Sequence, residues 1–136
     1  MRILLIEDDP ILALTFASTL GQGGHHIGGI AYTVAEAYEL AATQEDVDLA
    51  LIDVNLEGND EGIEVARQLK ARFSIPSLFV SGQVAAAQRH RDVALGLMKK
   101  PFPPLDLLRA IEAVAYVIGG SSSSTTSPPP ALTLFS

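Results

Sequence analysis

The chain of 136 residues contains no cysteine, which excludes a disulfide framework and thiolate chemistry. Basic residues are few: nine lysines and arginines stand against sixteen acidic residues, for a formal net charge of −7. A nucleic-acid-binding surface normally carries a basic stripe, so this balance argues against direct contact with nucleic acid. No apolar run is long enough to span a bilayer, so we expect no membrane partner. The first residues lead directly into a strand pattern without a small-residue cleavage site, so we expect no signal peptide and a cytoplasmic protein.

Along residues 2–118, short apolar runs alternate with amphipathic patterns of helical period. With 48% hydrophobic residues, a chain of this length can bury the core of one globular domain. Near-continuous apolar strands that alternate with helices are typical of a parallel sheet covered on both faces. The pattern therefore predicts an α/β fold, a doubly wound (βα)5 domain with a five-stranded parallel sheet.

Polar side chains stand where four of the predicted strands end. In open α/β sheets the ligand lies off the carboxyl ends of the strands, near the point where the strand order reverses. We therefore expect these side chains to meet at one edge of the sheet. They are Glu7 and Asp8 after the first strand, Asp53 at the end of the third, Ser81 at the end of the fourth and Lys100 after the fifth.

The residue types at this edge predict phosphoryl chemistry. Clustered carboxylates repel one another and favour a bound cation, and Mg²⁺ prefers oxygen ligands. A carboxylate can form a covalent acyl phosphate, and a lysine can neutralise the charge on the transferred group. Taken singly, each residue also has a structural explanation, as a solvated acid at a strand end or as a helix cap. Asp9 is better explained as an N-cap, because Pro10 follows it.

Four stretches, in this order and spacing, make the chain resemble the receiver domain of two-component response regulators. The resemblance covers residues 1–118 and implies the flavodoxin-like form of the doubly wound fold. The matching stretches are Ile3–Pro10, Leu51–Leu56, Leu78–Gly82 and Lys99–Phe102.

The resemblance implies a magnesium site and a phosphoacceptor. Asp8 and Asp53, with the backbone carbonyl of Asn55, would hold Mg²⁺, and Glu7 would act on the ion mainly through water. Asp53 would accept a phosphoryl group from a histidine kinase or a histidine phosphotransfer protein. Two further residues would each bond a phosphoryl oxygen, namely Ser81 and Lys100.

The function implied is a switch in phosphorelay signal transduction that acts through altered contacts with a downstream protein. The aspartyl phosphate would be lost slowly to water, and the chain would not be a multiple-turnover enzyme. Phosphatases with an aspartate nucleophile often carry a second aspartate two positions on, where this chain has Asn55. The resemblance is also compatible with a homodimer. The alternative is a protein-interaction module with the receiver fold that works without phosphorylation.

Three features depart from the family pattern. The loop after Asp53 lacks the Met-Pro pair of many receivers, and Leu97 stands where an aromatic residue is common. The fourth helix, predicted over residues 84–91, is short.

Residues 119–136 are rich in serine, threonine and proline, and we expect a low-complexity tail that adds nothing to the core. Its apolar end, residues 131–135, could dock on a partner.

Overall fold

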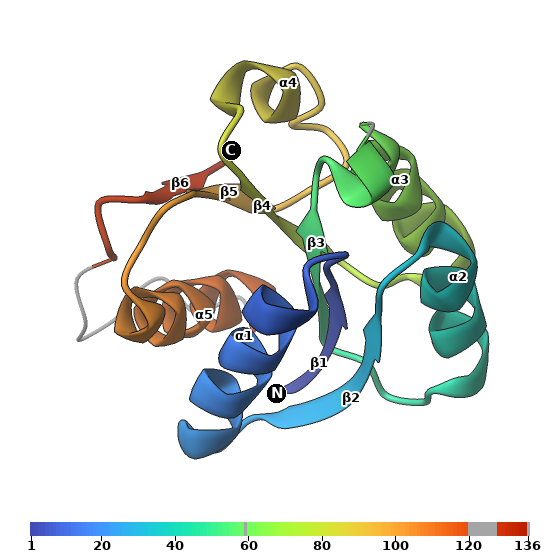
Figure 1. Cartoon of the computed structure of the whole chain (residues 1–136), viewed down its shortest axis with the longest axis horizontal. Helices are drawn as coiled ribbons and strands as arrows, with labels where there is room; N and C mark the ends of the chain where they lie inside the picture. Colours follow the sequence, from blue (N-terminus) through green and yellow to red (C-terminus); the bar gives the residue numbers. More distant parts are fainter. Residues whose placement is uncertain (59, 120–127, 136) are drawn as a thin grey trace.

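The computed structural model describes residues 1–58, 60–119 and 128–135. It shows one central sheet with helices on both faces (Figure 1). Five strands are parallel, and the described residues add a sixth that runs antiparallel. In spatial order the strands are β2 (His26–Ala31), β1 (Arg2–Ile6), β3 (Leu49–Asp53), β4 (Ser77–Ser81), β5 (Gly96–Lys99) and β6 (Leu132–Leu134).

Four helices lie between consecutive parallel strands, as the alternating pattern predicts: α1 (Pro10–Gln22), α2 (Val34–Thr43), α3 (Glu61–Phe73) and α4 (Val84–Gln88). A fifth helix, α5 (Pro104–Ile118), follows β5. Helices α1 and α5 contact each other on one face of the sheet, and α2 and α3 contact each other on the opposite face (Figure 1). No helix in the described part of the chain is long and apolar enough to cross a membrane. A short 3-10 turn, η1 (Leu56–Gly58), precedes α3.

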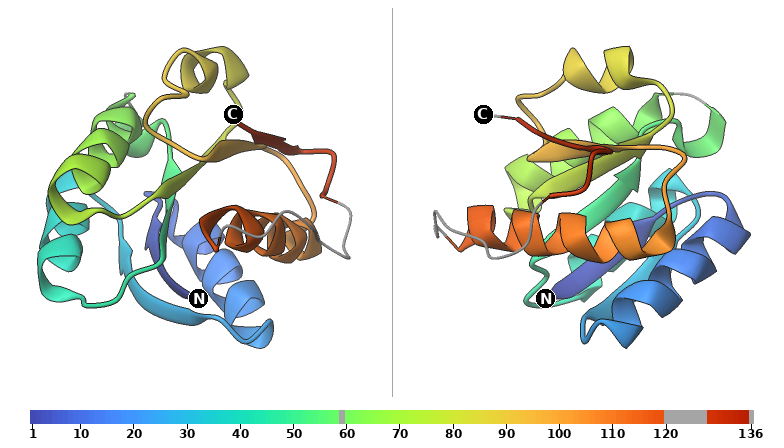
Figure 2. Two further views of the ribbon diagram at one scale, coloured as in Figure 1. Left: turned by 180° about the vertical axis from the view of Figure 1, so that it is seen from behind. Right: turned by 90° about the vertical axis from the view of Figure 1, so that its left-hand side faces the viewer.

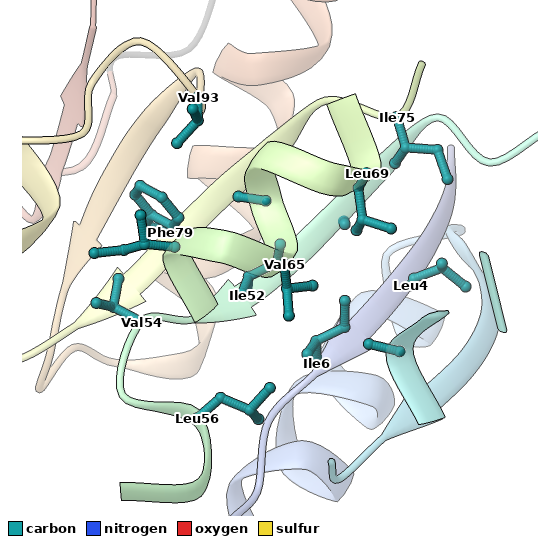
Figure 3. Close-up of a cluster of buried hydrophobic side chains, with 14 of the residues drawn as sticks. Leu4, Ile6, Ile52, Val54, Leu56, Val65, Leu69, Ile75, Phe79 and Val93 are labelled. Carbon is teal, nitrogen blue, oxygen red and sulfur yellow. The ribbon is translucent and has the colours of Figure 1, made fainter. Parts of the chain in front are cut away.

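The core divides into two clusters because successive side chains of a strand point to opposite faces of the sheet. In β1, Leu4 and Ile6 face the cluster under α2 and α3, drawn in Figure 3, whereas Ile3 and Leu5 face the cluster under α1 and α5. Every residue of β3 and β4 is buried. The near-continuous apolar runs are therefore confirmed as strands covered on both sides.

The start of α1 follows the cap that the sequence predicts. Asp9 is the N-cap, and its Oδ1 accepts the backbone N–H groups of Ile11 at 2.9 Å and Leu12 at 3.3 Å. Pro10 occupies the first helical position, where no N–H is needed. The cap fixes the point at which the chain turns away from the end of β1.

The C-terminal part of the chain differs from the prediction. Strand β6 pairs with β5 and extends the sheet beyond the five strands expected (Figure 2). Leu132 packs against the cluster under α1 and α5, and Phe135 packs against the opposite cluster. The expectation that the tail adds nothing to the core is therefore wrong for residues 131–135. Residues 120–127 and 136 of that tail lie outside the described residues.

A smaller difference concerns the segment between β4 and β5. Helix α4 ends at Gln88, three residues before the predicted end. The prediction that the fourth helix is short is confirmed. Helix α5 ends at Ile118, where the resemblance to a receiver domain also ends.

Candidate functional site

Three carboxylates converge at the carboxyl ends of β1 and β3, which are neighbours in the sheet. One oxygen from each of Glu7, Asp8 and Asp53 lies within 4.8 Å of the others. Glu7 and Asp53 are buried, whereas Asp8 is exposed. The strand order reverses between β1 and β3, so the cluster occupies the place where this fold class binds ligands.

Lys100 brings a positive charge to the cluster from the loop after β5. Its Nζ lies 2.9 Å from Oε1 of Glu7 and 3.9 Å from Oδ1 of Asp53. The Lys100 backbone N–H donates to the carbonyl of Ser81 at 2.9 Å, which fixes the loop beside the end of β4. One ammonium group therefore faces the two buried carboxylates of the cluster.

The buried carboxylates are held in an unfavourable environment. Burial raises the pKa of Glu7 to about 7, although the hydrogen bond from Lys100 opposes this shift and the charge of Asp53 adds to it. Burial also raises the pKa of Asp53, against the attraction of Lys100. Because burial of a charge is costly unless it is compensated, this set of oxygens gains from a further cation.

Ser81 lies at the same edge as Asp53. Asp53 pairs with Val80 in the sheet, so Ser81 extends one residue beyond that pair. The Ser81 side chain is buried, and its Oγ accepts the backbone N–H of Gln83 at 2.9 Å. The hydroxyl is therefore bonded within its own loop, at the start of the segment that leads into α4.

Backbone groups of the loop after β3 hold the carboxylates in place. The N–H of Asn55 donates to Oδ1 of Asp53 at 3.1 Å, and the N–H of Glu57 donates to Oδ2 of Asp8 at 3.1 Å. Asn55 thereby lies beside Asp53, and its carbonyl accepts the N–H of Gly58 at 2.9 Å. The acidic loop that begins at Glu57 contributes a backbone donor, which its side-chain composition does not reveal.

One residue that supports the site was missed in the sequence analysis. Gly62, in the first turn of α3, donates its N–H to the carbonyl of Val54 at 3.1 Å. A Cβ at this position would collide with the carbonyl oxygen of Asp53 and lie 2.9 Å from Cα of Val54. The helix therefore packs directly on the end of β3. The only signal in the sequence is a glycine near a helix start, where it lowers helix propensity.

The fold and this edge identify the class of protein. Residues 3–112 match the response regulator receiver domain family, and the chain belongs to that family. Receiver domains are regulatory modules that generally bind Mg²⁺ at an acidic pocket. They interact with histidine kinases or phosphotransfer proteins and with downstream partners.

Individual relatives are response regulators of greater length. The chain is 28% identical to the phyllosphere-induced regulator PhyR of Methylorubrum extorquens, over 85% of this chain and 43% of PhyR. It is 32% identical to the transcriptional regulatory protein PdtaR of Mycobacterium tuberculosis, over 82% of this chain and 55% of PdtaR. The chain thus spans about half the length of these curated relatives.

Solved receiver domains have the same fold. One is the CheY-like receiver domain protein of Methanospirillum hungatei, with a TM-score of 0.76 and 25% identity over 88% of this chain and 96% of that chain. Another is the receiver domain of a modulated diguanylate cyclase from Desulfovibrio desulfuricans, with a TM-score of 0.71 and 28% identity over 87% and 95% of the two chains. The predicted flavodoxin-like fold is confirmed.

Proposed function

We propose that the chain is a phosphorylation-controlled switch in the cytoplasm, in which Asp53 accepts a phosphoryl group from a histidine kinase or a histidine phosphotransfer protein. The observation that carries the proposal is the convergence of Glu7, Asp8 and Asp53 within 4.8 Å, with the Lys100 ammonium 3.9 Å from Asp53. Such a set supplies a nucleophilic carboxylate, ligands for a divalent cation and a fixed positive charge.

The donor set fits Mg²⁺. Asp8 and Asp53, with the carbonyl of Asn55, would hold the ion, and Glu7 would act through water. All these donors are oxygens, and the site offers few carboxylates directly, which suits an ion that retains several waters. When bound, the ion neutralises negative charge on the carboxylates and on the phosphoryl group. The raised pKa values of Glu7 and Asp53 support this fit, because both shifts report uncompensated burial of negative charge.

The residues of the chain would promote phosphoryl transfer by orienting the Asp53 carboxylate and by neutralising charge on the phosphoryl group. An oxygen of Asp53 forms a bond to phosphorus while the bond from phosphorus to the donor histidine nitrogen breaks. The backbone N–H of Asn55 holds the Asp53 carboxylate in orientation. Lys100 would pair with a phosphoryl oxygen, for which its ammonium needs only a small movement away from Glu7.

Ser81 would link the site to the rest of the molecule. Its hydroxyl, now bonded to the Gln83 backbone, would bond a phosphoryl oxygen instead. Loss of the bond to Gln83 would release the start of the segment that leads into α4. The phosphorylated and unphosphorylated forms would then present different surfaces to a downstream protein, as a two-state switch requires.

The second candidate is a receiver-fold interaction module that works without phosphorylation. Leu97 favours it, because this fully buried aliphatic residue packs in the core and offers no aromatic ring that could change its exposure. The intact set of carboxylates speaks against it, since such a module would not need buried acids.

Intact-mass spectrometry after incubation with acetyl phosphate and Mg²⁺ separates the two candidates. We expect one added phosphoryl group in the wild type and none in Asp53→Asn or with a chelator. Asp9→Asn is the matched control, because Asn caps a helix as well as Asp and residue 9 lies outside the carboxylate cluster. Absence of an adduct, together with absence of a spectroscopic response to beryllofluoride, would favour the interaction module.

A further inference from the structure

The outer edge of β5 is closed by the C-terminal segment of the chain. β5 is hydrogen-bonded to β4 on one side and to β6 on the other (Figure 2). Without β6, β5 would present a row of unpaired backbone groups, which is a template for an added strand. The segment 129–135 therefore occupies a surface that is chemically suited to bind an extended peptide.

Backbone hydrogen bonds hold both ends of the segment. The N–H of Lys99 donates to the carbonyl of Ala131 at 2.9 Å, and the N–H of Phe135 donates to the carbonyl of Leu95 at 2.8 Å. Between these bonds, Leu97 lies opposite Thr133 in the antiparallel register. These hydrogen bonds use main-chain atoms, so extended segments of many different sequences could form them.

Two side chains of the C-terminal segment also contact the core. Leu132 packs against the cluster under α1 and α5, whereas Phe135 packs against the opposite cluster. The guanidinium of Arg91 lies 5.6 Å from the centre of the Phe135 ring, within the range of a cation–π contact. The occupied edge thus contacts an aliphatic residue and, three positions later, an aromatic residue.

The edge is shaped for close approach of a strand. A Cβ at Gly96 would lie 2.5 Å from the carbonyl oxygen of Thr133 and 3.2 Å from Cα of Leu134. Any larger residue at position 96 would push the added strand outward. The glycine therefore serves the outer edge of β5, since its parallel partner in β4 is on the other side.

The hold of the segment is limited. β6 has only three residues, and the side chains of Thr133 and Leu134 are exposed. Because the strand is short, a competing strand needs to replace few backbone hydrogen bonds, although the attached segment has the advantage of a high effective concentration.

We propose that the outer edge of β5 is a docking edge for an extended peptide segment of a partner protein, with an aliphatic residue and an aromatic residue three positions apart, and that residues 129–135 occupy this edge in cis. A partner strand then binds by displacing the chain's own segment. This proposal is independent of phosphorylation at Asp53.

Thr133→Pro in the full chain tests the proposal. Proline removes the N–H of the central residue of β6 and is not tolerated in a paired strand, whereas the exposed side chain of Thr133 loses little packing. Thr133→Ala keeps the N–H and is the matched control. The probe is a fluorescent synthetic peptide of residues 128–135, and the control peptide carries serine in place of Leu132 and Phe135.

We expect the probe to bind Thr133→Pro at least tenfold more tightly than it binds the wild type or Thr133→Ala, and the control peptide to bind none of them. Hydrogen exchange supplies an internal check, because the Lys99 N–H bonds to Ala131 and the Lys100 N–H bonds to Ser81. In Thr133→Pro, the Lys99 amide should lose protection, the Lys100 amide should keep it, and the probe should restore protection at Lys99.

Three results would overturn the proposal. One is a Lys99 amide that exchanges freely in Thr133→Pro without any binding of the probe. Another is a Lys99 amide that stays protected in Thr133→Pro, which would show that strand pairing does not hold the segment. The third is a wild-type dimer that Thr133→Pro dissociates, which would show that the segment docks between two copies.

Discussion

The carboxylate site and the outer edge of β5 differ in the chemical groups that form them. The site consists of charged side chains, two of them buried, and its contacts are specific to residue type. The edge consists mainly of backbone donors and acceptors, with a few apolar side chains beside them. A buried charge is costly, so its presence in a sequence demands an explanation. Backbone groups occur at every residue, so a surface made from them leaves little trace in the sequence.

The largest effect on the site should follow loss of its ammonium group. In Lys100→Met, Glu7 and Asp53 would lose the ammonium group that lies beside them, and the charge on a transferred phosphoryl group would be less well compensated. We expect the rate of phosphorylation by acetyl phosphate to fall about a hundredfold, measured by intact mass over time. Lys99→Met, at the exposed neighbouring position, should leave the rate unchanged. Equal loss in both variants would mean that the charge of the loop, and not its contact with the carboxylates, matters.

Substitution of the glycine that supports β3 should have the next largest effect. In Gly62→Ala, the new Cβ would force α3 away from the end of β3. We expect the free energy of unfolding to fall by about 2 kcal/mol in urea denaturation, as for overpacked sites in general. Gly21→Ala is the control, since nothing lies within 4 Å of a Cβ at that helical position. The control should leave stability unchanged or raise it. Similar stabilities of the two variants would contradict the packing assigned to Gly62.

The pH dependence of stability should report the buried acids. Folding raises the pKa of Glu7 from 4.5 to about 7, so the folded chain binds protons more strongly than the unfolded chain. In the presence of a chelator, the contribution of this group to stability is therefore greatest at low pH and declines as the pH rises from about 4.5 to 7. Glu7→Gln should flatten this decline in urea titrations at several pH values. Glu45→Gln, at an exposed position, should not.

Added Mg²⁺ should oppose that decline. A ligand that binds only the folded chain stabilises it in proportion to the logarithm of its concentration. We expect Mg²⁺ to raise the midpoint of unfolding more at pH 8 than at pH 5, because the carboxylates are then deprotonated. An equal effect at both values would argue against these acids as ligands.

The smallest effect should come from the outer edge. Phe135→Ala removes a partly buried ring and its contact with Arg91, so we expect a loss of about 1 kcal/mol in stability, less than for a fully buried ring. Phosphorylation by acetyl phosphate should stay within about twofold of the wild type, since the ring lies outside the carboxylate cluster. A large loss of phosphorylation would show that the outer edge of β5 and the carboxylate site are coupled.

The predictability of each region follows from the same contrast. The sheet was predictable because the strands are apolar at nearly every position, and the edge that carries Glu7 and Asp53 was predictable because acids end two such strands. Gly62 was missed because its role depends on the close approach of α3 to the backbone at the end of β3, which no residue pattern in the sequence records. β6 was missed because three residues beyond a proline run carry no periodic signal.

The most direct test is to locate the phosphoryl group. Sodium borohydride reduces an aspartyl phosphate to homoserine, which peptide mass spectrometry identifies at a defined position. After phosphorylation by acetyl phosphate with Mg²⁺, the account predicts homoserine at position 53 and unmodified acids at positions 7, 8 and 9. Homoserine at one of these other positions, or none at all despite an intact Lys100–Asp53 pair, would contradict the assignment of Asp53 as the phosphoacceptor.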